Sequence, residues 1–132
     1  MAVIDWSGGL NAFYRKRVVA AALAIASKAC AVRTDHMAAI RRSASVAFAR
    51  QLAMYLCHVV ADMSLRDVAK EFGRDRTTAG HACHAIEDRR ECPIFDRQIE
   101  LLERDLRSRI RDMLNEAAQP LPPERKSFRL IA

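Results

Sequence analysis

Apolar side chains recur with helical spacing along two segments in the first half of the chain. Residues 10–30 contain no proline or glycine, and six apolar positions approximate one helical face: Phe13, Val18, Ala21, Ala22, Ile25 and Ala29. Residues 45–61 repeat the pattern with a stripe made of Val46, Ala49, Ala53, Leu56, Cys57 and Val60. Both segments are therefore predicted to be helices, and the basic stretch 41–45 before the second is predicted to be an ordered loop.

Capping residues mark two more helices in the middle of the chain. Ser64 is a favourable N-cap because its hydroxyl can accept from an early backbone N–H, and Asp67 resembles the acidic half of a capping box. The helix that follows should end at Gly73, since glycine readily adopts a positive φ. Asp75 then caps a helix over residues 76–89 that should bury Ala79, Ala82, Cys83 and Ile86. A short helix, a glycine turn and a second helix are typical of a helix-turn-helix.

Pro93 suits the first position of a fifth and longer helix, over residues 93–118. Its apolar stripe is predicted to contain Ile94, Gln98, Leu101, Leu102, Leu106, Ile110, Met113, Leu114 and Ala117. The second half of the stripe either packs on the first helix or exposes an apolar face to a partner. Charged residues on the opposite face form three i,i+4 pairs: Glu100 with Arg104, Glu103 with Arg107, and Asp105 with Arg109. Residues 119–132 contain three prolines and are predicted to be a flexible tail.

Composition supports an all-α fold and argues against a membrane protein. Apolar residues make up 51% of the 132 residues but aromatic residues only 6%, which favours helices over strands. The longest apolar run, residues 18–27, has about half the length that a membrane-spanning helix needs. The first seven residues carry an acid and no base, unlike a secretory signal. We therefore expect a cytoplasmic protein.

The positive charge lies entirely in the first half of the chain. Residues 1–61 hold eight basic and two acidic residues, whereas residues 62–132 hold fourteen of each, so the first half accounts for the net charge of +6. A localised positive charge favours a polyanionic partner. On charge alone, DNA, RNA and anionic lipid all remain candidates.

No arrangement typical of an enzyme or a metal site is found. The four cysteines lack CxxC spacing and are interpreted as small buried hydrophobic residues. His81, Cys83 and His84 lie close in sequence, but no second ligand cluster accompanies them and nothing would orient a catalytic base. None of the four glycines begins a GxxxxGK[ST] phosphate loop. We therefore expect no catalytic activity, no metal and no cofactor.

Residues 41–103 resemble the C-terminal DNA-binding domain of the bacterial replication initiator DnaA, known as domain IV. The resemblance is carried by three linked segments, which read ARQLAMYLC, SLRDVAKEFG and RDRTTAGHACHAIE, in the order of that family and at nearly its spacing. It implies a helix-turn-helix that binds double-stranded DNA. Because the ATP-binding loop of DnaA is absent from this sequence, the resemblance implies a stand-alone reader of DNA.

The resemblance also implies a role for individual residues. Arg42 falls where a family arginine enters the minor groove, whose negative potential attracts arginine. The residues implied to meet base edges in the major groove are Asp75, Arg76, Thr77 and Thr78. The residues implied to contact DNA phosphates are Arg41, Arg50, Gln51, His58, Arg74 and His81.

This chain departs from the family at the tip of the second helix of the motif. Arg76 stands where the family usually has histidine, and Ala79-Gly80 replaces a bulkier apolar pair. Only Gly73 stands at a turn where many members have two glycines. Since an arginine can form a bidentate contact with guanine O6 and N7, we expect a site related to the DnaA box but altered at one position.

Four regions follow from these interpretations, and together they suggest a regulator. Residues 1–40 should form an N-terminal helix packed on the core, 41–105 the helix-turn-helix domain, 106–118 a helix extension and 119–132 the flexible tail. We expect a sequence-specific transcriptional regulator, more readily an activator than a repressor, such as those of gene-transfer-agent or phage-like gene clusters. Residues 106–132 are the predicted surface for RNA polymerase, an architectural DNA-binding protein or a co-activator.

Two other functions and two simpler structural interpretations remain open. The chain could compete with DnaA for origin sites and so control replication, or serve as an adaptor whose helix-turn-helix contacts only protein. Helix capping alone accounts for an aspartate at position 75 followed by threonines. Arg41 and Arg42 could likewise be an ordinary solvated pair, although their distance from the helix-turn-helix favours DNA.

Overall fold

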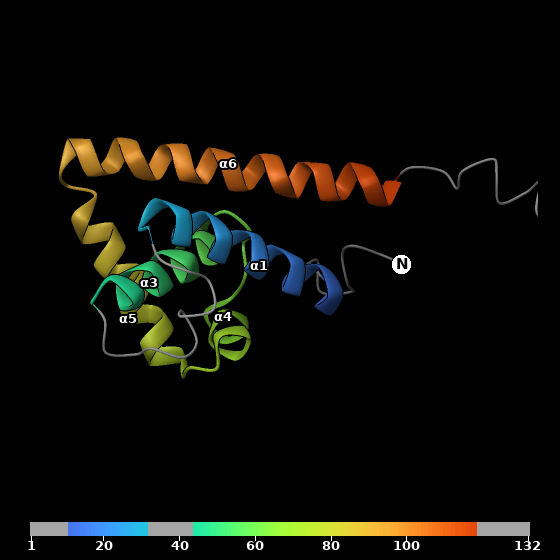
Figure 1. Cartoon of the computed structure of the whole chain (residues 1–132). Coiled ribbons are helices and arrows are strands. Elements are labelled where there is room, and N and C mark those ends of the chain that lie inside the picture. The colour runs from blue at the N-terminus through green and yellow to red at the C-terminus, as the bar shows by residue number, and fades with distance from the viewer. Residues whose placement is uncertain (1–10, 32–43, 119–132) are drawn as a thin grey trace, which may run out of the picture.

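The computed structural model describes residues 11–31 and 44–118, which form five helices and no strand (Figure 1). These are α1 (Ala12–Ala29), α3 (Ala44–Val59), α4 (Leu65–Phe72), α5 (Arg76–Arg89) and α6 (Pro93–Ala118). The all-α prediction is confirmed, and α5 and α6 begin and end at the predicted residues. The predicted tail, and Arg41 and Arg42 of the predicted loop, lie outside the described residues.

Local hydrogen bonds explain where the helices of the motif begin and end. The Ser64 hydroxyl accepts from the Asp67 N–H at 3.1 Å, and Asp75 Oδ1 accepts from the Thr78 N–H at 2.7 Å. Gly73 has a φ of 63°, in the left-handed region, and lies between α4 and the cap of α5. Each cap was predicted from residue type, because capping depends on neighbours within one turn.

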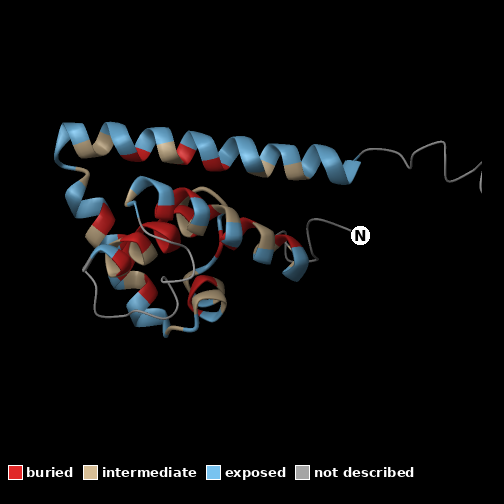
Figure 2. Cartoon of the chain, in the orientation of Figure 1, coloured by how far each residue is buried: buried red, intermediate tan, exposed pale blue. Residues whose placement is uncertain are grey.

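Helix α3 lies at the centre of the core. Every residue from Leu52 to Cys57 is buried, which is expected of a helix surrounded by others. It packs against α1 on one side and against α4 and α5 on the other. Figure 2 shows the buried residues gathered where these helices meet, while the outer side of α6 is exposed. Helix α5, the second helix of the predicted helix-turn-helix, is therefore packed directly on the central helix of the core.

The predicted apolar face of α1 is partly wrong. Tyr14 is 7% exposed, whereas the neighbouring Phe13 is 50% exposed and has its ring edge against the Tyr14 ring. Ala29 is also exposed, while Val19 and Ala26 are buried. The buried face is rotated by about one residue, because α1 contacts both α3 and α6 and not a single partner.

Helix α6 lies along α1, and this contact decides which of its faces is buried (Figure 1). Leu106 is fully buried, and Ile110 and Met113 pack against the core as half-buried residues. In the second half of the predicted stripe, the residues up to Met113 therefore pack on the rest of the molecule, whereas Leu114 and Ala117 are exposed. Three further predicted stripe residues are exposed instead of buried: Ile94, Gln98 and Leu101. Ile99, absent from the predicted stripe, is buried in their place.

A cluster of charged side chains fixes the corner between α5 and α6. Arg90 donates to Tyr55 Oη at 2.8 Å, to Glu103 Oε2 at 3.1 Å and to Asp96 Oδ1 at 2.5 Å. Glu103 is buried, so its predicted surface pairing with Arg107 is wrong. Of the three predicted i,i+4 pairs, the one formed in the described helix is Asp105 with Arg109, at 3.1 Å.

The cysteines divide into two buried and two more accessible residues. Burial raises the pKa of the Cys57 thiol to about 12 and that of Cys83 to about 11, as expected for small core residues. Cys30 is half-buried and Cys92 is exposed, so the prediction of a buried residue is wrong for Cys92. No helix within residues 11–31 and 44–118 has the length and apolar character to span a bilayer.

Candidate nucleic-acid interface

The first turn of α5 presents four polar residues at the surface. Asp75, Arg76, Thr77 and Thr78 are all exposed, as a reading tip requires. The opposite side of α5 is buried against α3 and α4 through Ala79, Ala82, Cys83 and Ile86, as predicted. The helix is thus anchored by its apolar face and exposes its N-terminal residues, which is the geometry with which a recognition helix enters the major groove.

Asp75 has a structural role in addition to any contact with DNA. Its carboxylate caps α5, and the hydrogen bond from the Thr78 N–H holds the pKa of Asp75 below its ordinary value. The group is therefore an anion at neutral pH. An ionised carboxylate can accept from cytosine N4, so capping and base contact use the same charge state.

Arg76 is exposed and makes no hydrogen bond or ion pair with any of the described residues. An arginine without an internal partner retains all five N–H donors for a ligand. Thr77 and Thr78 follow it with a hydroxyl and a methyl group each, which suit a base edge and a thymine methyl.

The implied phosphate contacts on α3 lie well inside that helix. Arg50 and Gln51 are half-buried and occupy the second turn after Ala44. Backbone N–H groups at that depth are engaged in the helix, so only the side chains of these residues can reach a phosphate. Free backbone N–H groups therefore do not assist them.

His58 is half-buried and engaged within the fold. Its Nδ1 lies 2.7 Å from the Met63 carbonyl oxygen. Because a carbonyl only accepts, Nδ1 carries the proton, and a neutral ring leaves Nε2 as an acceptor. His58 can therefore donate to a phosphate only when the ring is doubly protonated.

The remaining implied contacts are distributed around the motif. Arg74, in the turn before α5, is half-buried, and its Nη1 lies 3.4 Å from the Gly73 carbonyl oxygen. His81 is exposed on α5. Arg41 and Arg42 lie outside the described residues, so the structure places neither of them.

A hollow brings together residues from three segments beside the recognition tip. It is lined by His58, Ser64, Leu65, Arg66 and Arg76, and we call it the α4–α5 hollow. Arg66 was not among the residues implied by the resemblance. One signal could have identified it, since a basic residue in the first turn of a helix is opposed by the helix dipole and suggests a role other than stability.

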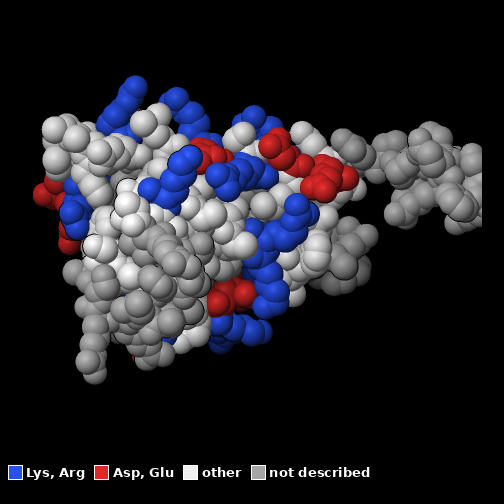
Figure 3. Space-filling view, viewed as in Figure 1, with Lys and Arg blue, Asp and Glu red and all other residues white. Residues whose placement is uncertain are grey.

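The positive charge of the first half is partly neutralised in space. Helix α1 carries Arg15, Lys16, Arg17 and Lys28 and no acidic residue. Arg15 and Lys16 lie 4.0 and 3.6 Å from Glu71 of α4, and Arg17 lies 3.2 Å from Glu116 of α6. Figure 3 shows blue and red atoms alternating across this face. The charge excess seen in the sequence therefore does not form one continuous basic surface over α1.

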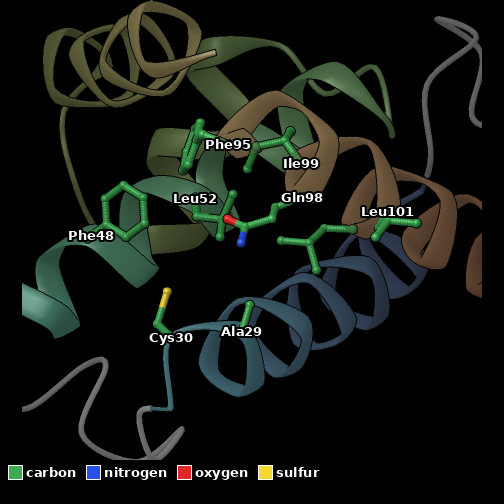
Figure 4. Close-up of a pocket in the computed structure, with 9 residues that line it drawn as sticks. Ala29, Cys30, Phe48, Leu52, Phe95, Gln98, Ile99 and Leu101 are labelled. Carbon is green, nitrogen blue, oxygen red and sulfur yellow. The ribbon is translucent and has the colours of Figure 1, made fainter. Parts of the chain in front are cut away.

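A second, apolar pocket lies between the end of α1, the start of α3 and α6 (Figure 4). Phe48, Phe95 and Leu101 line it together with Gln98 and Cys30. Burial raises the pKa of the Cys30 thiol, and no base is among the lining residues, so the pocket lacks an activated nucleophile.

No metal centre is formed within the described parts of the chain. No three His, Cys, Asp or Glu side chains gather closely enough there to hold an ion. Of the residues considered in the sequence, Cys83 is buried, while His84 is exposed with its ring 4.0 Å from Glu87.

Comparisons with known proteins agree with this geometry. The family described as the bacterial dnaA protein helix-turn-helix matches residues 18–86, which include most of α1 and the whole of α3, α4 and the recognition tip. A crystal structure described as a DNA replication initiation factor superposes with a TM-score of 0.66 and 27% sequence identity. That match covers 73% of this chain but 30% of the other protein. The chain therefore belongs to the family of the DnaA helix-turn-helix, a DNA-binding and non-catalytic domain.

Proposed function

We propose that this protein is a sequence-specific, double-stranded DNA-binding transcriptional regulator. It reads the major groove with the first turn of α5 and the minor groove with Arg42. The observation that carries the proposal is the exposed set Asp75 to Thr78, held at the N-terminus of a helix whose other face is buried. A merely structural helix start would need the cap alone, whereas Arg76 adds an unengaged guanidinium.

Each residue of the tip has a chemical role in this proposal. Arg76 forks onto guanine O6 and N7, Asp75 accepts from cytosine N4, and the threonine methyl groups contact thymine. Phosphate contacts from Arg41, Arg50, Gln51, His58, Arg74 and His81 set the register of the domain on the duplex.

The regulatory role rests on what the chain adds to the helix-turn-helix. Helix α6 continues to Ala118, far beyond the family match that ends at residue 86. We propose that residues 106–132 contact RNA polymerase, an architectural DNA-binding protein or a co-activator, and that the protein activates genes such as those of gene-transfer-agent or phage-like clusters. Its expected location is the bacterial nucleoid.

A second candidate function is replication control through competition with DnaA for origin sites. The observation that favours it is the similarity to a DNA replication initiation factor. The chain shares the helix-turn-helix of that protein but matches only 30% of its length. Chromatin binding followed by sequencing separates the two functions. Enrichment at promoters supports regulation, and enrichment at the origin supports competition.

Selection of bound duplexes from a random pool tests the reading of DNA directly. We expect an enriched motif related to the DnaA box, with a guanine at the position facing Arg76. Recovery of the unmodified DnaA box would show that Arg76 does not alter specificity. Recovery of no motif would contradict sequence-specific binding and favour the adaptor interpretation.

A further inference from the structure

We propose that Arg66 binds a DNA phosphate in the α4–α5 hollow, beside the base-reading side chain of Arg76. The inference rests on the proposed DNA binding and adds to it a backbone contact from α4. It assigns the two arginines different tasks, with Arg76 selecting the sequence and Arg66 fixing the position of the domain.

The lining of the hollow suits a phosphodiester. Two of its five residues, Arg66 and Arg76, carry a positive charge, and none is acidic. The Ser64 hydroxyl accepts the N–H of Asp67 and so keeps its own proton available as a donor. With Arg76 engaged on a base, the Arg66 guanidinium and the Ser64 hydroxyl remain at the hollow as donors to a phosphate oxygen.

Nothing within the described fold accounts for an arginine at position 66. Its side chain is exposed and makes no hydrogen bond or ion pair with the described residues. It also lies in the first turn of α4, where the helix dipole disfavours a cation. By contrast, Arg90 in the same molecule has three side-chain partners. The position of Arg66 is therefore understandable as a ligand contact and not as a stabilising one.

The relation of α4 to α5 places Arg66 where a DNA backbone would pass. In a helix-turn-helix the second helix lies in the major groove while the first crosses the phosphate backbone. Here α4 is the first helix, and the hollow joins its first turn to that of α5. Gly80, one turn after Arg76, lies beside Leu65 of the hollow, since a Cβ built on it would meet Leu65 Cδ1 at an ordinary contact distance of 3.9 Å. A duplex read by Arg76 would thus bring a flanking phosphate to Arg66.

The test compares Arg66→Ala and Arg66→Lys with the wild-type protein at several salt concentrations. The probes are the best duplex from the random-pool selection and a duplex of scrambled sequence. Arg104→Ala is the matched control, since it removes one exposed arginine from α6, a helix that contributes no residue to the α4–α5 hollow. We expect Arg66→Ala to weaken binding to both duplexes by about tenfold at low salt, because a charge-assisted hydrogen bond is lost.

The salt dependence identifies a phosphate contact. Loss of one phosphate contact lowers the slope of log K against log salt by about 1, so the loss of affinity between 50 and 200 mM salt becomes about fourfold smaller. Arg66→Lys should retain most of the affinity, since a phosphate accepts a point charge, whereas a guanine contact needs the fork of arginine.

Three outcomes would overturn the inference. Arg66→Ala could bind like Arg104→Ala, or it could keep the wild-type salt slope and relax the preference at one base pair, which would make Arg66 a base reader. Arg66→Lys could bind as weakly as Arg66→Ala. Failure of the proposed function looks different, because the wild-type protein itself would then bind the selected and scrambled duplexes equally.

Discussion

The two ends of α5 use arginine in opposite ways. Beyond its C-terminal end, Arg90 is surrounded by Tyr55, Asp96 and Glu103, and all three accept hydrogen bonds from it. At its N-terminal end, Arg76 has no partner among the described residues and projects from the surface. The side-chain chemistry is the same, but the environment assigns Arg90 to the fold and leaves Arg76 available for the proposed contact with DNA.

This contrast predicts which substitutions affect stability and which affect binding. Removing an arginine that has partners inside the protein leaves those partners without their cation. Removing an arginine that has no such partner leaves the fold unchanged. Four experiments test the separation, from the largest expected effect to the smallest.

Arg90→Met should cause the largest loss of stability. The substitution leaves the Glu103 carboxylate, whose side chain is 8% exposed, without its cation, and we expect the free energy of unfolding to fall by about 3 kcal/mol in urea titrations. Arg109→Ala is the control, because its exposed i,i+4 pair with Asp105 contributes only about 0.3–0.5 kcal/mol.

A second substitution distinguishes a lost ion pair from lost packing. Glu103→Met added to Arg90→Met should recover part of the stability, because no buried carboxylate then lacks a partner. If Arg90→Met were as stable as the wild type, the contacts of Arg90 at the α5–α6 corner would contribute nothing to stability. The contrast between Arg90 and Arg76 would then fail.

Arg76→Ala should have the complementary effect. We expect binding to the selected duplex to weaken by about 1–3 kcal/mol and the preference at one base pair to relax, with the free energy of unfolding changed by less than about 0.5 kcal/mol. Fluorescence anisotropy on the selected duplex and on its single-position variants measures the first effect, and urea titration measures the second. A large loss of stability would show that Arg76 has a structural partner after all.

Local features of the fold were predictable from sequence, and long-range features were not. The caps Ser64 and Asp75 and the stop at Gly73 were found because each acts within one turn. The buried face of α6 was misplaced because it is chosen by contact with α1, which is about 80 residues away. Pattern alone offered several apolar positions on α6 and no means of ranking them.

The candidate site divides in the same way. Asp75 to Thr78 were identified from a resemblance, and their exposure agrees with a reading role. Arg66 was missed because the α4–α5 hollow is assembled from the end of α3, the start of α4 and the start of α5. Within one segment, only its place in the first turn of α4, where the helix dipole disfavours a cation, indicates it.

Asp75 both caps α5 and is proposed to contact a base, and two substitutions separate these two roles. Asp75→Asn keeps a good capping residue and removes the charge, whereas Asp75→Ala removes both. We expect Asp75→Ala to lower the melting temperature and Asp75→Asn to change it little, while both alter the base preference in anisotropy measurements. Equal melting temperatures for both variants and wild type would show that the cap contributes nothing.

The pH dependence of the Asp75 cap has a definite sign. The hydrogen bond from the Thr78 N–H lowers the pKa of Asp75 in the folded state below its ordinary value of 3.8. Its contribution is therefore fully present above about pH 4 and is lost as the pH falls through the lower, folded-state pKa. The difference in melting temperature between wild type and Asp75→Ala should accordingly narrow only in strong acid.

The smallest effects are expected when each of the two glycines of the helix-turn-helix is replaced by alanine in turn. Gly80→Ala should stabilise the protein by up to about 1 kcal/mol, because alanine favours a helix and the added Cβ meets Leu65 Cδ1 at an ordinary contact distance of 3.9 Å. Gly73→Ala should destabilise it by about 1 kcal/mol, since the φ of 63° is unfavourable for a residue with a Cβ, although nothing lies within 4 Å of that atom. Urea titrations that gave both variants the same sign would show that backbone conformation does not decide the difference. If Gly80→Ala also kept the affinity of the wild type for the selected duplex, the tip of α5 would tolerate a more stable helix, and its polar residues alone would account for binding.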